Sequence, residues 1–192
     1  MSTRLRWIGI SGSLRAESYN TKLLKTIAGM LPDDVEMEIL SIADIPLYNG
    51  DLDLPAAGKR PEIVTQFRDK LAGCHALVIV SPEYNYSIPG GLKNAIDWAS
   101  RGKDSPLLRK PVAVFGATTG MWGTARMQVA FQPVFQFLDM QPVFQPEVLI
   151  AKAEEKFDAD GLFKDEKGKE IIKKKLDALK KLTLRNLADQ QA

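Results

Sequence analysis

The sequence of 192 residues contains one cysteine, one histidine and no apolar run long enough to cross a membrane. Cys74 alone cannot form an internal disulfide, and Cys74 with His75 cannot supply the ligands of a usual zinc site. We therefore expect no bound metal and no membrane partner. Because the N-terminus also lacks a signal-like apolar segment, we expect a cytoplasmic protein.

The scarcity of cysteine and histidine also argues against two forms of nucleophilic catalysis. A cysteine phosphatase carries an arginine six residues after its thiolate, but Val80 stands at that position after Cys74. A Ser-His-Asp hydrolase would have to use His75, which precedes an apolar strand at the amino end of the predicted sheet. We expect Cys74 to be a packed thiol.

Net charge is also small, at +2, which is too small to indicate a nucleic-acid-binding protein. The segment from Lys164 to Lys181 holds eight lysines, but it also holds four acids, and apolar residues recur in it every three to four positions. This pattern predicts an amphipathic helix whose lysines face water. We expect no nucleic-acid partner.

A loop rich in hydroxyl groups follows the first apolar run, Trp7 to Ile10, and precedes a helical pattern. Gly12 permits close approach of the backbone to a ligand, Arg15 supplies a cationic fork, and Asn20 can cap the helix or donate to a ligand. Three further residues offer hydroxyl donors: Ser11, Ser13 and Ser18. The loop predicts a phosphate site at a helix N-terminus, or else an ordinary turn that ends in a helix cap. Neither GxxxxGK[ST] nor GxGxxG is present.

A second loop follows the buried strand expected at 76–81. Residues 82–91 contain two prolines, two glycines and the run Tyr84, Asn85, Tyr86. Such a segment suits a rigid rim whose backbone groups face a flat heteroaromatic ring. The alternative is a loop whose tyrosines cover the edge of the sheet.

Apolar runs and helical patterns alternate along the chain. We expect strands at 5–10, 35–41, 76–81, 111–116 and 141–150, and helices at 20–31, 61–72, 90–100, 124–138 and 165–187. This order predicts a single α/β domain over 1–192. It would have three layers: a five-stranded parallel sheet of order 2-1-3-4-5 and helices on both faces, with a ligand crevice between strands 1 and 3. The long segment 43–60 either has a functional role or only connects two layers of the fold.

Two segments carry a resemblance to a known family: GSLRAESYN at 12–20 and PEYNYSIPGGLKNAIDWASR at 82–101. They resemble the NADPH-dependent FMN reductase family, and within it the chromate and quinone reductase branch. The resemblance includes 42–48 and 110–112, covers most of 5–150, and fades in the C-terminal helix. It implies a flavodoxin-like fold, non-covalent FMN, and NADPH or NADH as co-substrate.

The resemblance also implies binding residues. The FMN phosphate would contact Ser13, Leu14, Arg15, Ser18, Tyr19 and Asn20, and the flavin ring would rest against Pro82, Glu83, Tyr84 and Asn85. A third loop at 116–120 would add Thr118, where relatives often carry serine. Since the flavin brings its own redox centre, no side chain is expected to be catalytic.

The expected activity is hydride transfer from NAD(P)H to FMN, then reduction of small acceptors such as quinones or chromate. The alternative is an electron carrier of the flavodoxin type without NAD(P)H turnover; such carriers are usually acidic, whereas this chain is slightly basic. A signalling receiver domain would need an acidic cluster after strand 1, where only Glu17 stands. Family members form dimers or tetramers. We expect a homodimer or homotetramer, with Trp122 near the interface. Trp98 either lies there too or belongs to the core, and Arg126 is either an interface contact or a solvated surface residue.

Overall fold

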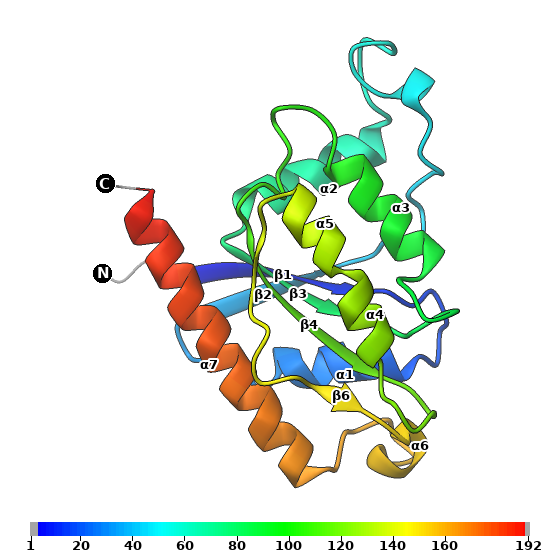
Figure 1. The fold of residues 1–192 in the computed structure, drawn as a ribbon, viewed down its shortest axis with the longest axis vertical. Coiled ribbons are helices and arrows are strands. Elements are labelled where there is room, and N and C mark those ends of the chain that lie inside the picture. Colours follow the sequence, from blue (N-terminus) through cyan, green and yellow to red (C-terminus); the bar gives the residue numbers. More distant parts are fainter. Residues whose placement is uncertain (1–3, 191–192) are drawn as a thin grey trace.

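The structure is a computed structural model that describes residues 4–190, and it contains a parallel sheet with helices on both faces (Figure 1). The expected strand order is confirmed: β2-β1-β3-β4-β5, with an additional strand, β6, pairing with β4. The strands are β1 (Leu5–Ser11), β2 (Val35–Leu40), β3 (Ala76–Val80), β4 (Pro111–Ala117), β5 (Gln141–Pro142) and β6 (Leu149–Ile150). The helices are α1 (Tyr19–Ala28), the 3-10 turn η1 (Gly50–Leu52), α2 (Glu62–Gly73), α3 (Gly90–Ala99), α4 (Ala125–Ala130), α5 (Gln132–Phe137), α6 (Ala153–Lys156) and α7 (Glu166–Asp189).

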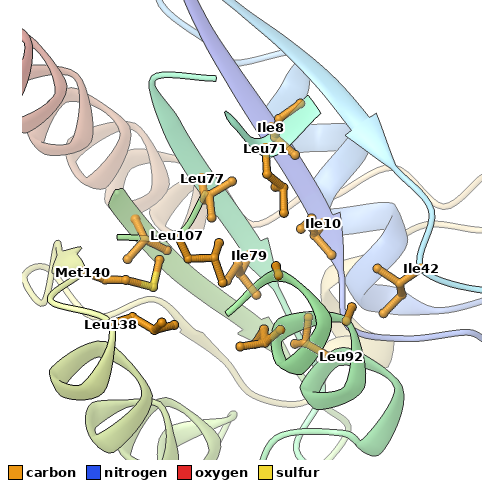
Figure 2. Close-up of a cluster of buried hydrophobic side chains, with 14 of the residues drawn as sticks. Ile8, Ile10, Ile42, Leu71, Leu77, Ile79, Leu92, Leu107, Leu138 and Met140 are labelled. Atoms are coloured by element: carbon orange, nitrogen blue, oxygen red, sulfur yellow. The ribbon is translucent and has the colours of Figure 1, made fainter. Parts of the chain in front are cut away.

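Successive side chains of the central strands point to opposite faces of the sheet, so a hydrophobic core forms on each face. In β1, Ile8 and Ile10 face α2 and α3, whereas Leu5 and Trp7 face α1 and α7. Figure 2 shows the first core, in which strand residues meet side chains from the covering helices and loops. Burial on both faces explains why these strands read as unbroken apolar runs.

The strand expected at 141–150 is two short strands. β5 pairs with the beginning of β4, at Pro111 and Val112, and β6 pairs with its end, at Gly116 and Ala117. Prolines at 142 and 146 lack the N–H group that a continuous ladder needs, so the pairing is interrupted between the two strands.

The helix expected at 124–138 is also divided, into α4 and α5, with Phe131 between them. Pro133 stands in the first turn of α5 and cannot donate a hydrogen bond to the preceding turn. The break therefore has a local cause in the sequence.

The long segment 43–60 is fastened to α3. Asn94 Nδ2 and Trp98 Nε1 both donate to the Pro46 carbonyl, at 2.9 and 2.7 Å. Farther along, the buried Asp53 carboxylate pairs with Arg60 Nε at 2.6 Å. Trp98 is fully buried in the first core, so it does not contribute to an exposed rim or to a subunit interface there.

The lysine-rich segment forms α7, which packs Ile172, Leu176 and Leu179 against the sheet. The expectation that its lysines face water is wrong at one position, because Lys175 is only 1% exposed. Within residues 4–190, no helix has both the length and the apolar character needed to span a membrane.

Candidate functional site

Three loops lie together at the carboxyl edge of the sheet, following β1, β3 and β4. The first two are joined directly, because Gly12 N–H donates to the Val80 carbonyl at 2.8 Å. The second and third are joined where Ser81 N–H donates to the Phe115 carbonyl at 3.0 Å. A Cβ atom on Gly12 would stand 2.4 Å from Ser81 Oγ, so only glycine permits this close approach.

The first loop turns through its own hydroxyl groups before α1 begins. Ser13 Oγ accepts from the Arg15 N–H at 3.3 Å, and Ser11 Oγ lies 2.8 Å from Thr21 Oγ1. Ser18 is the N-cap of α1, and its Oγ accepts from the Asn20 N–H at 3.2 Å. The remaining N–H groups of the first helical turn have no acceptor within the helix, which makes this end of α1 attractive to an anion.

Charged and apolar side chains of the first loop point outward. Arg15 is exposed and Leu14 is 60% exposed, whereas the Tyr19 ring packs 5.2 Å from that of Phe157. The acid of this loop, Glu17, is paired with Lys22 at 2.7 Å. A hydrogen bond from the Lys22 ammonium lowers the pKa of the Glu17 carboxyl. The guanidinium of Arg15 therefore remains available to a ligand phosphate.

Asn20 has a different role from the cap that the sequence suggested. Its Oδ1 accepts from the Ala117 N–H at 2.8 Å, and its Nδ2 donates to the Ala117 carbonyl at 2.9 Å. Ser18 is the helix cap instead. The buried Asn20 amide thus joins the start of α1 to the end of β4.

The second loop contains a tight turn between Tyr84 and Ser87, which exchange backbone hydrogen bonds of 3.2 and 2.9 Å. The two central residues, Asn85 and Tyr86, have positive φ values of 49° and 62°. That pattern is the type I′ turn, and a tyrosine in the left-handed region stores backbone strain. Tyr86 is 68% exposed, and the Arg126 guanidinium lies 4.1 Å from its ring centroid.

Other residues predicted in this rim point inward. Pro82 is buried, and the Glu83 side chain is 11% exposed. Glu83 Oε2 accepts from the Met127 N–H at 3.0 Å, so the carboxylate is held at the beginning of α4. The Glu83 carboxylate is therefore engaged by α4, which leaves only the backbone groups of Glu83 for a ligand at this edge of the sheet.

The third loop is held from both sides. Thr118 N–H donates to the Ile150 carbonyl at 2.9 Å, and its Oγ1 accepts from the Gly120 N–H at 3.3 Å. Below it, a Cβ atom on Gly116 would lie 1.9 Å from Thr124 Oγ1 and 2.6 Å from the Ser81 carbonyl oxygen. Glycine at 116 is thus required for the second and third loops to pack together.

Sequence reasoning missed three residues that shape the site. Ser81 packs against Gly12, and the absence of a side chain on Gly116 leaves room for Thr124. Thr124 is fully buried, and its Oγ1 has no hydrogen-bond partner among the described residues. Thr124 had no sequence signal, because a single threonine before a helix is ordinary. Gly116, directly after an apolar strand, was a usable signal of close packing.

The residues present fit an FMN molecule. A cation, several hydroxyl groups and a helix N-terminus suit its phosphate, and the turn at 84–87 stands beside them as a border for a flat ring. In an open parallel sheet, the crevice between β1 and β3 is where such ligands bind. Fold and site together define the class of flavodoxin-like proteins that bind FMN.

The chain belongs to the NADPH-dependent FMN reductase family, whose model matches residues 5–155. It is 44% identical to an NAD(P)H-dependent FMN reductase of Pseudomonas aeruginosa over 179 residues, which is 93% of this chain and 95% of that protein. It is 40% identical to a quinone reductase of Escherichia coli, with 82% and 84% covered. Among solved structures, the Paracoccus denitrificans flavoenzyme FerB, an NAD(P)H:acceptor oxidoreductase, superimposes with a TM-score of 0.85 at 32% identity, covering 95% of this chain and 98% of FerB. The chain is accordingly an FMN-dependent oxidoreductase.

Proposed function

We propose that residues 1–192 form a single FMN-binding domain that oxidises NAD(P)H and reduces quinones. The observation that carries this proposal is the convergence of the Arg15 loop, the Tyr84–Ser87 turn and the Thr118 loop at one edge of the sheet. Bound FMN supplies the redox chemistry by accepting hydride and passing electrons on. The side chains bind and orient; none has to act as acid, base or nucleophile.

The phosphate is assigned to the first loop. Arg15 neutralises its charge, the hydroxyls of Ser13 and Ser18 donate hydrogen bonds, and the N-terminus of α1 adds its dipole. Ser11, Leu14, Tyr19 and Asn20 complete this group: Asn20 acts through the backbone of Ala117, and Tyr19 packs against Phe157, the residue after α6.

The ring is assigned to the backbone of 82–86 and to Thr118. Pro82 and the Glu83–Met127 hydrogen bond hold that backbone rigid, so that its N–H and carbonyl groups remain aligned with a planar edge. Tyr84 and Tyr86 are exposed beside it and can exclude water from one side of the ring. The other face stays open for the nicotinamide and then for the acceptor.

Quinones are the acceptors that we assign first, and chromate is a second candidate. An open site selects its electron acceptors by their access to the flavin and by the free energy of electron transfer more than by their shape. A small oxyanion that reaches the ring is therefore also reduced. The supporting observation is the exposure of the rim tyrosines.

A homodimer or homotetramer in the cytoplasm is also proposed. Beside the rim, Met121 and Trp122 are 77% and 68% exposed, and a second subunit would bury them. Arg126 lies between Tyr86 and Trp122 and is positioned to contact that subunit.

The test is a pair of rapid-mixing experiments on FMN-loaded protein. Anaerobic NADPH, or NADH in a parallel arm, should bleach the flavin absorbance, and menadione should then restore it. Repeated turnover with chromate would support the second acceptor. Failure of both nicotinamides to bleach the flavin, with dithionite still doing so, would favour the electron-carrier alternative.

A further inference from the structure

Lys175 is a buried cation outside the flavin site. It lies on α7 and is 1% exposed, whereas its neighbours Lys173 and Lys174 are exposed. Its Nζ stands 5.4 Å from the ring centroid of Phe115, on β4. Contact with an aromatic face favours the charged form of the amine, although a ring only partly replaces water.

The described part of the chain supplies no ion-pair partner for this ammonium. Within residues 4–190, Lys175 Nζ takes part in no hydrogen bond and no ion pair, and the carboxylate that acts on it, Glu147, is exposed and beyond ion-pair distance. Burial lowers the pKa of Lys175 to about 8, so the amine is still mostly protonated at neutral pH. A buried charge without a partner is unfavourable, and a counter-ion would relieve the cost.

The ammonium lines a small cavity of about 50 Å³ between α4, α5, the segment joining β5 to β6, and α7. Gln128, Gln132 and Glu147 are its other polar lining residues, and the rest are apolar. The Gln128 amide nitrogen already donates to the Val148 carbonyl at 3.0 Å. The Gln132 side chain is exposed, and its amide is the other uncharged polar group of the lining.

We propose that this cavity binds a small monovalent anion, of the size of chloride, nitrate or formate, as the counter-ion of Lys175. The volume admits only a few heavy atoms, since a single water needs about 10–15 Å³ of such space. Sulfate carries a second negative charge that the single ammonium of Lys175 leaves unpaired near the Glu147 carboxylate, and an aromatic carboxylate is larger than this volume. The inference is independent of the proposed redox function, because its residues belong to none of the three site loops.

The primary experiment uses the FMN-loaded protein and bromide as the probe. Crystals grown in bromide should show an anomalous peak within hydrogen-bonding distance of Lys175 Nζ. In solution, ³⁵Cl line broadening should be saturable, and bromide should compete with it while sulfate at equal ionic strength should not. A peak elsewhere only, or a carboxylate of Glu147 or of a neighbouring copy paired with Lys175, would overturn the proposal.

Variants distinguish anion binding at this cavity from non-specific effects of salt on the protein. Lys175→Met should abolish the saturable broadening, and the matched control Lys174→Met, one residue away on the exposed face, should leave it unchanged. Gln132→Leu should weaken binding several-fold, whereas Glu147→Gln should strengthen it by removing a competing negative charge. Circular dichroism and FMN content check that each variant is folded. Equal broadening in wild type and Lys175→Met would refute the site.

Discussion

The side-chain amide of Asn20 forms two hydrogen bonds with the backbone of Ala117, with Oδ1 accepting at 2.8 Å and Nδ2 donating at 2.9 Å. These two hydrogen bonds resemble those between paired strands of a sheet, although Asn20 belongs to a helix. It fixes the first turn of α1 against the end of β4. The first and third loops of the site consequently move as one body.

Loss of this amide should cost both stability and cofactor affinity. Asn20→Ala leaves a buried N–H and a buried carbonyl unpaired, which should lower the free energy of unfolding of the apoprotein by roughly 2–4 kcal/mol. Urea denaturation measures this loss. Asn49→Ala is the control, because Asn49 caps only the exposed turn η1. An unchanged urea midpoint for Asn20→Ala would contradict this account of the loops.

Gly116 should tolerate no side chain. Gly116→Ala places Cβ against the Ser81 carbonyl as well as Thr124, and backbone cannot move aside, so we expect a loss of about 2 kcal/mol or more together with weaker FMN binding. Gly73→Ala, at the end of α2 with no atom within 4 Å of its Cβ position, should be neutral or slightly stabilising. Thermal unfolding and flavin titration of both variants check the contrast. Equal behaviour would disprove it.

Arg15 should contribute mainly to binding and little to folding, because it is exposed and its guanidinium is assigned to the ligand phosphate. A charge-assisted hydrogen bond of about 1.5–3 kcal/mol corresponds to FMN binding weaker by roughly 10- to 100-fold in Arg15→Ala. Quenching of FMN fluorescence measures the affinity. Lys25→Ala, on the exposed side of α1, controls for net charge. An affinity equal to the control's would remove Arg15 from the site.

Stability should depend on pH through Lys175. Its pKa is lowered by burial from 10.5 to about 8, so between these values the unfolded chain binds more protons and the free energy of unfolding rises with pH. The rise attributable to this group is roughly 3 kcal/mol. Lys175→Met should flatten that part of the profile and, in buffer without small anions, should be more stable than wild type near pH 7. Urea titrations of both proteins from pH 7 to 10.5 provide the comparison, and parallel profiles would count against it.

Cys74 should react slowly with thiol reagents. It is 4% exposed, its Sγ donates to the Leu71 carbonyl at 3.2 Å, and burial raises the pKa of its thiol. A disulfide reagent at pH 8 should therefore modify the folded protein far more slowly than the protein in urea. Rapid labelling of folded protein with retained flavin absorbance would show that the thiol is accessible after all.

Much of the fold was predictable because its strands are buried on both faces. Apolar runs such as 76–80 and 111–115 can be recognised as strands from the sequence without knowing which strands they pair with. The right-handedness of the connections between parallel strands then favours one strand order. The divisions of 141–150 and 124–138 were missed, although Pro142, Pro146 and Pro133 mark them. A continuous apolar pattern predicts one element in each range, whereas the missing proline N–H groups divide it in two.

The candidate site was predictable in its loops but not in its side-chain directions. Glu83 and Asn20 were placed in the site by motif, yet their side chains bind Met127 and Ala117 across the fold, which no local pattern reveals. Lys175 had a signal that was overlooked. It stands three residues after Ile172 and one before Leu176, on the apolar face of α7.

The course of α7 has a practical consequence for immobilising the enzyme. Asn186, near the end of this helix, donates to the Arg109 carbonyl just before β4 begins, and Leu5 opens β1 at the same edge of the sheet. Both ends of the described chain therefore lie opposite the three loops (Figure 1). A tether to an electrode or bead at either end would leave the redox edge facing the solution, where dissolved acceptors arrive.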